Sequence, residues 1–387
     1  MTTSRPIRTA IIGLSPSSVT SWASAAHLPN FINDQGKSKF QIVALCNSSV
    51  ASAQAAIDVY GLDPSSTKAY GSPEDLAADA DVEFVICSTR VDNHFKTVLP
   101  SLQAGKDVYI EWPIASTAEE IKTLVDESVR SGAQVLIGLQ GRWAAPVVKL
   151  RETVGRVGRV LSVDVRAFGG TVDRETLTVG LKYLAQRRVG GNPITIGVGH
   201  LSDFVQSVVG KVVPETIQSR LQLQRPDVKL HDPQGSIVDT IVSDVPDLLH
   251  FHGRLAPSPQ TDANATLSFS FRRGQPFPDT PSLTWSINGT LGELRIVSPS
   301  NMMLQAFVDQ SVRIQLHRFD TDAVEDVEWD WDETAKQVPD RARSVGKVLY
   351  AYADWKQGVR KERDWVDIGE AAELATVIEG IFANFQA

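Results

Sequence analysis

Cysteine is scarce in this chain. The 387 residues contain only Cys46 and Cys87, each within a short apolar run typical of a buried strand. A small secreted domain held together by disulfides would carry more cysteines at regular spacing. We therefore expect two thiols in the core and no disulfide.

Basic residues are in the minority. The chain has 38 Lys and Arg against 46 Asp and Glu, which gives a formal net charge of −8. Proteins that bind nucleic acid usually present a clustered positive surface, and no basic cluster occurs here. We expect no direct nucleic-acid partner.

Long apolar runs are also missing. No stretch approaches the ~18 apolar residues of a transmembrane helix, and Met1–Pro6 lacks the apolar core of a signal peptide. We expect no membrane association and a cytoplasmic location. The 42% hydrophobic content is enough for a large core in two domains.

The first ~140 residues alternate between strand and helix patterns. A capping box at Ser116–Glu119 opens the clearest helix, which continues through Ile121, Leu124 and Val125 at helical spacing. Nearly continuous apolar strands joined by helices are typical of a doubly wound parallel sheet, a Rossmann fold. We place this domain at residues 1–143, with strands at Ile7–Ile12, Phe40–Cys46, Val82–Cys87, Val108–Ile110 and Gln134–Ile137.

Residues 144–387 have a different character. Strand patterns separated by turns predict an α+β domain with an open, mostly antiparallel sheet, and helices only at His200–Val209 and Ile368–Phe385. The acidic segment Asp320–Glu333 is typical of a solvated loop. The outer sheet face would form a homodimer surface if it were apolar. The expected strands are Val160–Arg166, Thr216–Leu223, Ser236–Val242, Leu249–Leu255, Ala265–Phe271, Ser282–Ile287, Glu293–Val297 and Val312–His317.

A weak dinucleotide motif follows the first strand. Gly13-Leu14-Ser15-Pro16-Ser17-Ser18 keeps one glycine of the usual Gly-x-Gly-x-x-Gly, which brings backbone N–H groups to a pyrophosphate. The hydroxyls of Ser15, Ser17 and Ser18 are candidate replacements for some of those donors. An ordinary strand–helix turn with a serine cap fits the same residues.

The end of the second strand bears on the choice of cofactor. An acidic residue there would bind a ribose 2′-hydroxyl, whereas an Arg would bind a 2′-phosphate. The chain has Asn47-Ser48-Ser49 instead. NAD and NADP therefore both stay open, with a slight preference for NADP because no carboxylate stands at this position.

Other chemistries lack support in the sequence. His250-Phe-His252 places two imidazoles on one strand face, but no further His or Cys lies nearby to complete a metal site. No Gly-x-Ser-x-Gly elbow and no phosphate loop ending in Gly-Lys-Ser/Thr occurs. We expect no bound metal.

Several segments resemble the family of glucose–fructose oxidoreductase, inositol dehydrogenase and the rhizopine-catabolism proteins. The similar segments are spread along most of the chain, and together they are more specific for the fold than for the reaction. They are Cys87–His94, Leu102–Pro113 with its Glu111-Trp112-Pro113, Gly190-Gly191 followed by Gly199-His200-Leu-Ser-Asp203, and Asn288–Leu294.

Within this family the chain is most similar to the fungal galactose-pathway repressor branch. Those proteins have the enzyme fold and bind a nicotinamide dinucleotide, but they restrain a transcriptional activator. The segments that carry this resemblance are Gly13-Leu14 with Trp22, Glu111-Trp112, Leu139-Gln140-Gly141-Arg142 and Val245–Gly253.

The resemblance implies a remodelled catalytic centre. Hydride transfer in the wider family uses the Lys of Glu-Lys-Pro and an Asp four residues before a His. These positions are Trp112 and Ile196 here, with Thr195 alongside, while His200 is kept. Imidazole exchanges protons near pH 7, so His200 is a candidate acid/base that faces the substrate. A core or capping histidine is the alternative.

Two further groups are weaker candidates. Tyr183, with its phenol biased toward ionisation by Lys182, could protonate a carbonyl oxygen. A structural Tyr beside a surface Lys is the alternative. Arg187 and Arg188 could bind a carboxylate or phosphate of the substrate, and a solvated pair is the alternative.

The resemblance also implies a set of cofactor contacts. Strand-end residues on the cofactor side are expected to touch the ribose, pyrophosphate or nicotinamide, with Trp112 stacked near the nicotinamide. Trp22 would flank the cofactor or else pack in the core. The set is Gly13, Leu14, Ser15, Ser17, Trp22, Asn47, Ser48, Ser88, Thr89, His94, Glu111, Trp112, Gln140 and Arg142.

Two functions follow from these patterns. The first is an NAD(P)-dependent oxidoreductase that moves a hydride to or from a carbonyl, imine or hydroxyl carbon of a polar small molecule. The second is a non-catalytic dinucleotide sensor that binds a protein partner. Loss of the Lys and Asp favours the sensor, whereas retention of His200 favours the enzyme.

Overall fold

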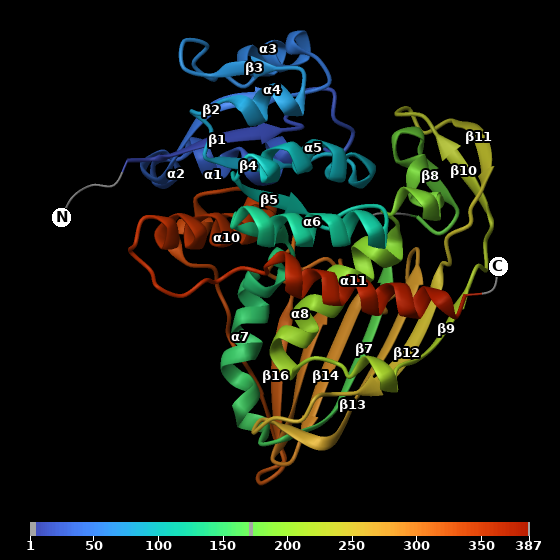
Figure 1. Cartoon of the computed structure of the whole chain (residues 1–387). Coiled ribbons are helices and arrows are strands. Elements are labelled where there is room, and N and C mark those ends of the chain that lie inside the picture. Colours follow the sequence, from blue (N-terminus) through green and yellow to red (C-terminus); the bar gives the residue numbers. More distant parts are fainter. Residues whose placement is uncertain (1–4, 170–172, 386–387) are drawn as a thin grey trace. The chain divides into compact units, whose positions relative to one another are not determined.

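The N-terminal alternation folds into a parallel sheet, as the sequence predicts (Figure 1). The strands pair in the order β3-β2-β1-β4-β5-β6. The order reverses between β1 and β4, which is where doubly wound sheets bind dinucleotides. The computed structural model describes residues 5–169 and 173–385, with β1 at Ile7–Ile12, β2 at Phe40–Cys46, β3 at Lys68–Tyr70, β4 at Phe84–Cys87, β5 at Asp107–Glu111 and β6 at Val135–Gly138.

Local details differ from the sequence prediction. The short strand β3 was not predicted, because three residues give too little alternation to detect. The capping box lies one residue later than expected. The Thr117 hydroxyl accepts from the Glu120 backbone N–H, and the Glu120 side chain accepts from the Thr117 N–H. Each pair satisfies a donor at the helix start.

The chain divides into two units, but not at a single point. The first unit ends at Gln140 and is then joined by Asp332–Glu373. The division after Gln140 lies close to the expected boundary at residue 143, whereas a return of the chain to the first unit was not part of that expectation. The first unit's helices are η1 (Ala23–His27), α1 (Pro29–Ile32), α2 (Asp34–Lys39), α3 (Val50–Val59), α4 (Pro73–Ala78), α5 (Val91–Gln103), α6 (Ala118–Ser131), α9 (Glu333–Lys336) and α10 (Asp340–Lys356), and α11 (Ile368–Ala383) begins in it.

Helix α10 was not expected from the sequence, and it completes the core of the first unit. It packs against η1, α1 and α2. Its Tyr352 ring stacks on Phe84 of β4 with centroids 4.3 Å apart, and Phe84 lies 6.2 Å from Phe40 of β2. Aromatic pairs at these separations add to the stability of a core beyond the area that they bury.

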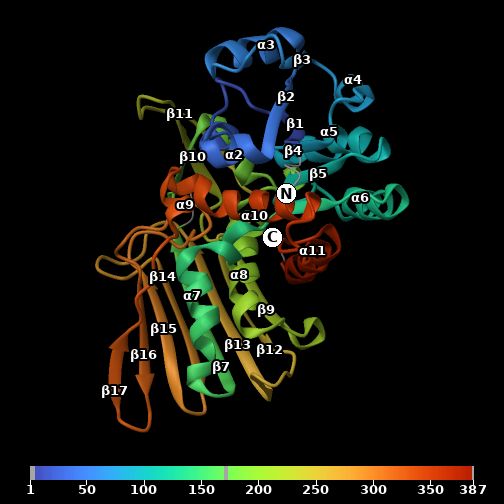
Figure 2. The same cartoon turned by 90° about the vertical axis from the view of Figure 1, so that its left-hand side faces the viewer.

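The second unit has an open sheet that is mostly antiparallel, as predicted. Its order is β17-β16-β15-β14-β7-β13-β12-β9, and the described strands of this one sheet pair antiparallel except for β7 with β13. Helices α7 (Ala145–Thr153) and α8 (Gly199–Val209) cover one face (Figure 2). The strands are β7 (Val160–Gly169), β9 (Gln218–Gln222), β12 (Leu248–Arg254), β13 (Thr261–Arg273), β14 (Leu283–Gly289), β15 (Gly292–Ser298), β16 (Arg313–Arg318) and β17 (Ala323–Asp326), and the short helical turns are η2 (Gln140–Trp143), η3 (Val154–Val157), η4 (Val179–Ala185), η5 (Arg187–Val189), η6 (Pro193–Val198) and η7 (Pro214–Thr216).

The other face of this sheet is polar. Buried and exposed residues alternate along its strands, as expected for a sheet packed on one side. Residues such as Arg166, His250, Ser270 and Thr284 point outward in neighbouring strands. The apolar outer face on which the homodimer expectation depended is therefore not found here.

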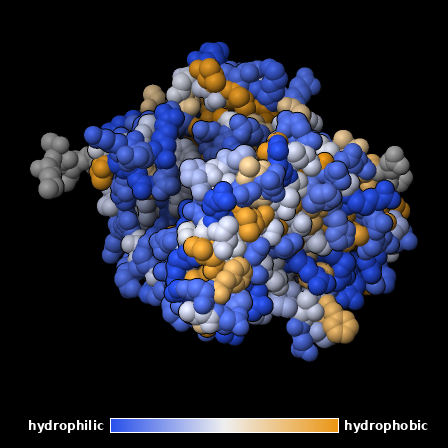
Figure 3. All heavy atoms as spheres, turned by 90° about the horizontal axis from the view of Figure 1, so that it is seen from below, coloured by the Kyte–Doolittle hydropathy of each residue, from blue (hydrophilic) through white to orange (hydrophobic). Residues whose placement is uncertain are grey.

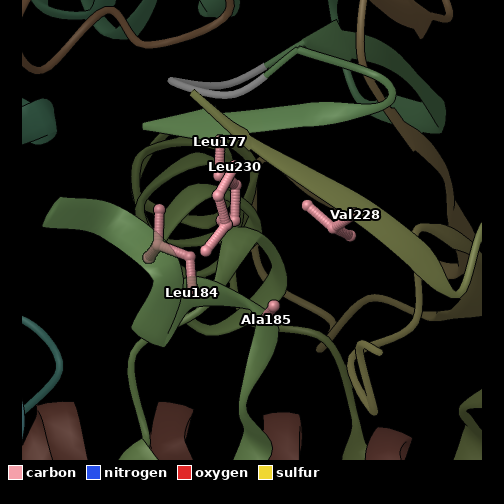
Figure 4. Packing of buried hydrophobic residues seen from close by; sticks show 5 residues of the cluster. All are labelled: Leu177, Leu184, Ala185, Val228 and Leu230. Atoms are coloured by element: carbon pink, nitrogen blue, oxygen red, sulfur yellow. The ribbon is translucent and has the colours of Figure 1, made fainter. Parts of the chain in front are cut away.

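A small second sheet extends the second unit. Strand β10 (Asp227–His231) pairs with β8 (Thr176–Thr178) and β11 (Ile237–Val242). Figure 4 shows the buried cluster beneath it, to which β8, η4 and β10 contribute side chains. Its buried members are Leu177, Leu184, Ala185, Val228 and Leu230.

The surface agrees with the acidic, polar composition. The segment predicted as a solvated loop, Asp320–Glu333, is largely exposed but contains strand β17 and the start of α9. Figure 3 shows one face on which hydrophilic side chains dominate and apolar ones form small groups. Across the described residues, none of the helices has the length and apolar character needed to cross a membrane.

Candidate functional site

The predicted cofactor residues of the first unit follow parallel strands at their carboxyl ends. Gly13 follows β1, Asn47 follows β2, Ser88 follows β4, and Glu111 ends β5. Parallel strands end at the same edge of a sheet, so one edge carries all of these positions. This is the edge where ligands of such sheets bind.

Gly13 allows two strand ends to approach closely. Its φ is +95°, and a Cβ atom at this position would lie 2.4 Å from the Ser88 carbonyl oxygen and 2.8 Å from a methyl group of Thr89. Its N–H donates to the Cys46 carbonyl at 3.0 Å. Glycine is the residue that adopts this conformation without strain. The close approach of the strand ends therefore explains why this position of the motif is a glycine.

The serines after Gly13 form a compact turn. The hydroxyls of Ser15 and Ser17 lie 3.0 Å apart, and the Ser18 N–H donates to the Ser15 carbonyl at 3.2 Å. Ser17 is exposed. This turn leaves hydroxyl groups at the strand end, and their contact with a pyrophosphate stays a prediction.

Asn47 connects two loops. Its side-chain amide donates to the carbonyl of Leu14 at 2.9 Å and to the carbonyl of Ser52 at 3.2 Å. Leu14 is fully buried, whereas Ser48 is exposed. The side chain of Ser49 caps α3 by accepting from the Ser52 N–H. Asn47 thus holds the turn after β1 against the start of α3.

His94 is buried at the start of α5. Its Nδ1 lies 2.9 Å from the Pro113 carbonyl oxygen, and its Nε2 lies 3.0 Å from the Thr89 carbonyl oxygen. Neutral imidazole has one N–H, so it donates to one carbonyl at a time. Burial lowers the pKa of His94 and favours this neutral form. Its expected contact with the cofactor stays a prediction.

The Glu111 carboxylate is contacted by other side chains of the first unit. Its Oε1 accepts from the Trp22 indole N–H at 2.8 Å and lies 2.5 Å from Nε2 of the fully buried His27. A Cβ atom at Gly138 would lie 2.6 Å from Oε2, so that glycine makes room for the carboxylate. Trp22 and His27 thereby connect η1 to the end of β5. Sequence reasoning missed His27, which lies 84 residues from Glu111.

Two further side chains at this edge are buried. Trp112, at the position of the family's Lys, is 6% exposed and precedes a cis peptide bond to Pro113. Gln140, just beyond β6, is fully buried, and neither its amide nitrogen nor its amide oxygen has a hydrogen-bond partner. Buried polar groups are nearly always paired, so an orphaned amide calls for an explanation.

These residues fit a dinucleotide. The missing side chain of Gly13 gives the close backbone approach that a pyrophosphate turn needs. The unpaired amide of Gln140 offers both a donor and an acceptor to a polar ligand. The edge therefore has a backbone cradle at β1 and an unmatched polar group at β6.

In the second unit, a cap precedes His200. The Asn192 side chain accepts from the N–H groups of Ile194 and Thr195, both at 3.0 Å, and the Thr195 hydroxyl donates to the Gly190 carbonyl at 2.8 Å. Thr195 therefore acts in a capping box at the start of η6. His200 lies in the first turn of the following helix α8 and is 6% exposed.

The position of the family's Asp has become apolar. Ile196 packs against the cluster under the small sheet, and Tyr183 packs against the same cluster. Lys182, its sequence neighbour, is exposed. This arrangement supports the structural alternative for Tyr183 and Lys182, because one side chain contacts the apolar cluster while the other faces water.

Arg142 forms a bidentate ion pair with Asp203. Its Nη2 lies 2.6 Å from Oδ1 and its Nε lies 3.0 Å from Oδ2 of this carboxylate, which is almost fully buried. Paired N–H···O bonds of this kind orient a guanidinium firmly. The Asp of the His-x-x-Asp motif therefore anchors Arg142, an interaction that the motif alone did not reveal.

The remaining candidates lie elsewhere on the second unit. The guanidinium of Arg187 stacks on the Phe382 ring at 4.8 Å, and Arg188 donates to Gln186 at 3.4 Å. His250 and His252 line a hollow of about 690 Å³ on the outer sheet face, and none of the predicted catalytic or cofactor residues lines it. Within residues 5–169 and 173–385, no group of three His, Cys, Asp or Glu side chains is arranged to hold a metal ion.

Comparison with known proteins agrees with this fold. Residues 7–139 match the oxidoreductase family with an NAD-binding Rossmann fold, and the chain belongs to this family. Residues 147–298 match the C-terminal domain of Gal80p. The family binds a nicotinamide dinucleotide, which agrees with the fit described above.

Two kinds of protein are similar to this chain in sequence. The dehydrogenase aclE of Aspergillus oryzae is 30% identical over 315 residues, which cover 78% of this chain and 79% of that protein. The galactose/lactose metabolism regulatory protein GAL80 of Kluyveromyces lactis is 29% identical over 318 residues, covering 78% and 67%. The Saccharomyces cerevisiae GAL80 is 26% identical, and the match covers 75% of this chain and 66% of that protein.

Solved structures show the same architecture. A super-repressor mutant of Gal80p from Saccharomyces cerevisiae superposes with a TM-score of 0.84 at 21% identity, covering 98% of this chain and 95% of that one. An NAD-binding oxidoreductase from Klebsiella pneumoniae gives a TM-score of 0.73 at 17% identity, covering 98% and 97%. At such low identity these matches support the fold.

Proposed function

We propose that this protein is a nicotinamide-dependent oxidoreductase. It would move a hydride between the cofactor and a carbonyl, imine or hydroxyl carbon of a polar small molecule. The observation that carries the proposal is the carboxyl edge of the first unit's sheet, where Gly13 leaves a backbone cradle and the buried Gln140 amide lacks a partner. The similarity to a protein named as a dehydrogenase supports it.

His200 is the proposed proton donor and acceptor. The bound nicotinamide supplies the hydride chemistry, and a neutral imidazole takes or gives the proton at the substrate oxygen or nitrogen. His200 is buried in the first turn of α8, so the helix holds its imidazole in a fixed position. The family's Lys and Asp are Trp112 and Ile196 here, so His200 is the remaining acid/base of that set.

The test combines binding and turnover in one cuvette. NADH or NADPH is added first, and its fluorescence is followed as panels of sugars, ketones and imines are added. We expect substrate-dependent loss of the reduced cofactor, with His200→Gln lowering kcat by roughly 10²–10⁴-fold and leaving cofactor binding intact. His252→Ala, exposed on the outer sheet face, is the matched control and keeps full turnover.

A non-catalytic dinucleotide sensor is the second candidate. Trp112 replaces the ammonium with a buried indole, and Ile196 lies against an apolar cluster where a carboxylate would be poorly solvated. Relatives named as regulatory proteins support this alternative and suggest a protein partner. Tight dinucleotide binding without turnover on broad panels would favour the sensor. Absence of any dinucleotide binding would contradict both candidates.

The assembly and location are proposals of the same kind. We propose that the protein is a cytoplasmic homodimer. Sedimentation at micromolar concentration tests this assembly, and a monomer mass across the range contradicts it. The negative net charge makes direct nucleic-acid binding unexpected.

A further inference from the structure

The end of β2 offers an acceptor and no free amide donor. Both N–H groups of the Asn47 side chain are used, one by the Leu14 carbonyl at 2.9 Å and one by the Ser52 carbonyl at 3.2 Å. The amide oxygen is the group left for a ligand. An oxygen acceptor matches a ribose hydroxyl, which can donate, and does not match a phosphate dianion, which can only accept.

The loop after β3 brings carboxylates to the same place. The Asn47 N–H donates to the Tyr70 carbonyl at 3.1 Å, and a Cβ atom at Gly71 would lie 2.8 Å from the Val50 backbone nitrogen. The next residues open helix α4, whose first turn holds the exposed Glu74 and Asp75. These two carboxylates therefore stand beside the end of β2.

The surroundings of the Cys46 thiol agree with this arrangement. Burial above all, with smaller contributions from the charges of Cys87, Glu74 and Asp75, raises the pKa of this thiol, the last residue of β2, to about 12. The Ser72 hydroxyl donates to the Glu74 carboxylate at 2.7 Å, and this bond lowers the pKa of Glu74 and keeps it ionised. The field at the end of β2 is therefore negative.

The segment that carries these carboxylates has a single basic residue, and that residue is engaged by other carboxylates. Lys68 is the only Lys or Arg between residues 40 and 89, and its ammonium lies 3.0 Å from carboxylate oxygens of both Asp79 and Asp81. The N-terminus of α3 acts against this negative field. A helix N-terminus carries about half a positive charge, against two full negative charges from α4.

We propose that this site selects NAD(H) and rejects the 2′-phosphate of NADP(H), an inference that rests on the dinucleotide-binding function proposed above. The Asn47 amide oxygen accepts from the 2′-hydroxyl, while Glu74 and Asp75 repel a phosphate at that position. Discrimination by a repulsive element is a common route to specificity. It reverses the slight preference for NADP that Asn47-Ser48-Ser49 suggested from the sequence.

The test is equilibrium binding, which needs no turnover. Isothermal titration of the full chain with ADP-ribose and with 2′-phospho-ADP-ribose removes any contribution of the nicotinamide. We expect the unphosphorylated probe to bind at least ~10-fold more tightly at low salt, with the ratio shrinking as salt screens the carboxylates. The double variant Glu74→Gln/Asp75→Asn should cut this ratio at least ~3-fold by strengthening only the phosphorylated probe.

Asp58→Asn provides the matched control. It removes one negative charge from the other end of α3 and should leave the ratio unchanged. Equal or tighter binding of the phosphorylated probe to the unmodified chain overturns the inference, as does a double variant with an unaltered ratio. If neither probe nor NADH binds, the dinucleotide-binding function itself fails, which is a distinguishable result.

Discussion

At the scale of single residues, Gln140 shows how function and stability conflict. Its amide is buried with neither atom paired, and an unsatisfied buried polar group costs ~1–3 kcal/mol. A protein that keeps such a group gains something from it elsewhere. We interpret that gain as ligand binding.

We predict that Gln140→Leu stabilises the protein and weakens its ligand binding. Removing the unpaired amide while keeping similar volume should raise the free energy of unfolding by ~1–2 kcal/mol in urea titrations. NADH affinity should fall at the same time. Gln103→Leu, on the exposed end of α5, is the control and should change neither value appreciably. A destabilised Gln140→Leu protein with normal NADH affinity would show that the amide has a structural partner in solution.

A second prediction at this scale concerns Gly13. An alanine there combines a positive φ with a Cβ atom 2.4 Å from the Ser88 carbonyl oxygen, so the strand ends must separate. We expect Gly13→Ala to lower the free energy of unfolding by ~2–4 kcal/mol and to abolish NADH binding.

Gly61→Ala is the control that separates the backbone strain of a positive φ from the crowding of the added Cβ atom. Gly61 also has a positive φ, of +62°, but nothing lies within 4 Å of its Cβ position. It should cost only the ~1–2 kcal/mol of the left-handed conformation and bind NADH normally. Equal losses in the two variants would mean that the contact with Ser88 is unimportant.

At the scale of elements, a buried carboxylate ties α10 to the sheet. The Asp107 side chain accepts from the Tyr352 hydroxyl at 2.7 Å, from Lys356 at 2.6 Å and from the Gln134 backbone N–H at 2.8 Å. Three donors surround one carboxylate, two of them from α10 and one from the backbone just before β6. This is the condition under which a buried charge is stable.

We predict that Tyr352→Phe destabilises the protein by ~1–3 kcal/mol, because it leaves the Asp107 charge short of a donor while keeping the aromatic ring. Thermal or urea unfolding of the variant measures the loss. Lys122→Ala breaks an exposed pair within α6 and should cost no more than ~0.5 kcal/mol. Similar losses in both variants would show that the Asp107 cluster is no stronger than a surface pair.

Elements were predictable where local pattern and fold agree. The parallel strands of the first unit other than β3 were found because each is a nearly continuous apolar run. The strands of the larger second sheet other than β17 were found because one face of that sheet is buried. Helix α10 was missed because it buries small residues such as Ala342, Gly346 and Ala353, which give a weak apolar stripe. A Cβ atom at Gly346 would lie 2.3 Å from the Asn30 side chain, so close packing demands those small residues.

The candidate site was predictable in position but not in its contacts. Strand ends on one edge follow from the parallel sheet, so Gly13, Asn47 and Glu111 were expected there. The partners of Glu111 are Trp22 and His27, which lie 89 and 84 residues away in sequence. Pairings over such distances depend on how the helices pack, and no local pattern encodes them.

At the scale of the whole molecule, buried thiol and phenol groups make the stability fall at alkaline pH. Burial raises the pKa of Cys46 from 9.0 to about 12, and it raises the pKa of Tyr109 and Tyr352 well above 10.0. A group with a raised pKa in the folded state keeps its proton while the unfolded chain loses it. The stabilisation is therefore complete below about pH 9 and is lost as pH rises toward 12.

We predict that the urea midpoint is constant from pH 7 to 9 and falls steadily above it. Cys46→Ala should make this fall less steep, since one of the groups responsible is gone. The native thiols should also react slowly with disulfide reagents at pH 8, because both cysteines are buried. A midpoint that is independent of pH up to 11, or rapid labelling of the native protein, would contradict this account.

The discontinuous first unit also bears on how the chain is made. Its sheet is complete once residue 138 has been synthesised, yet Tyr352, which stacks on Phe84, follows more than 200 residues later. On a ribosome, Phe84 of β4 therefore lacks its stacking partner while Gly141–Trp331 of the second unit is translated. A segment made late therefore completes the core of the part that was made early.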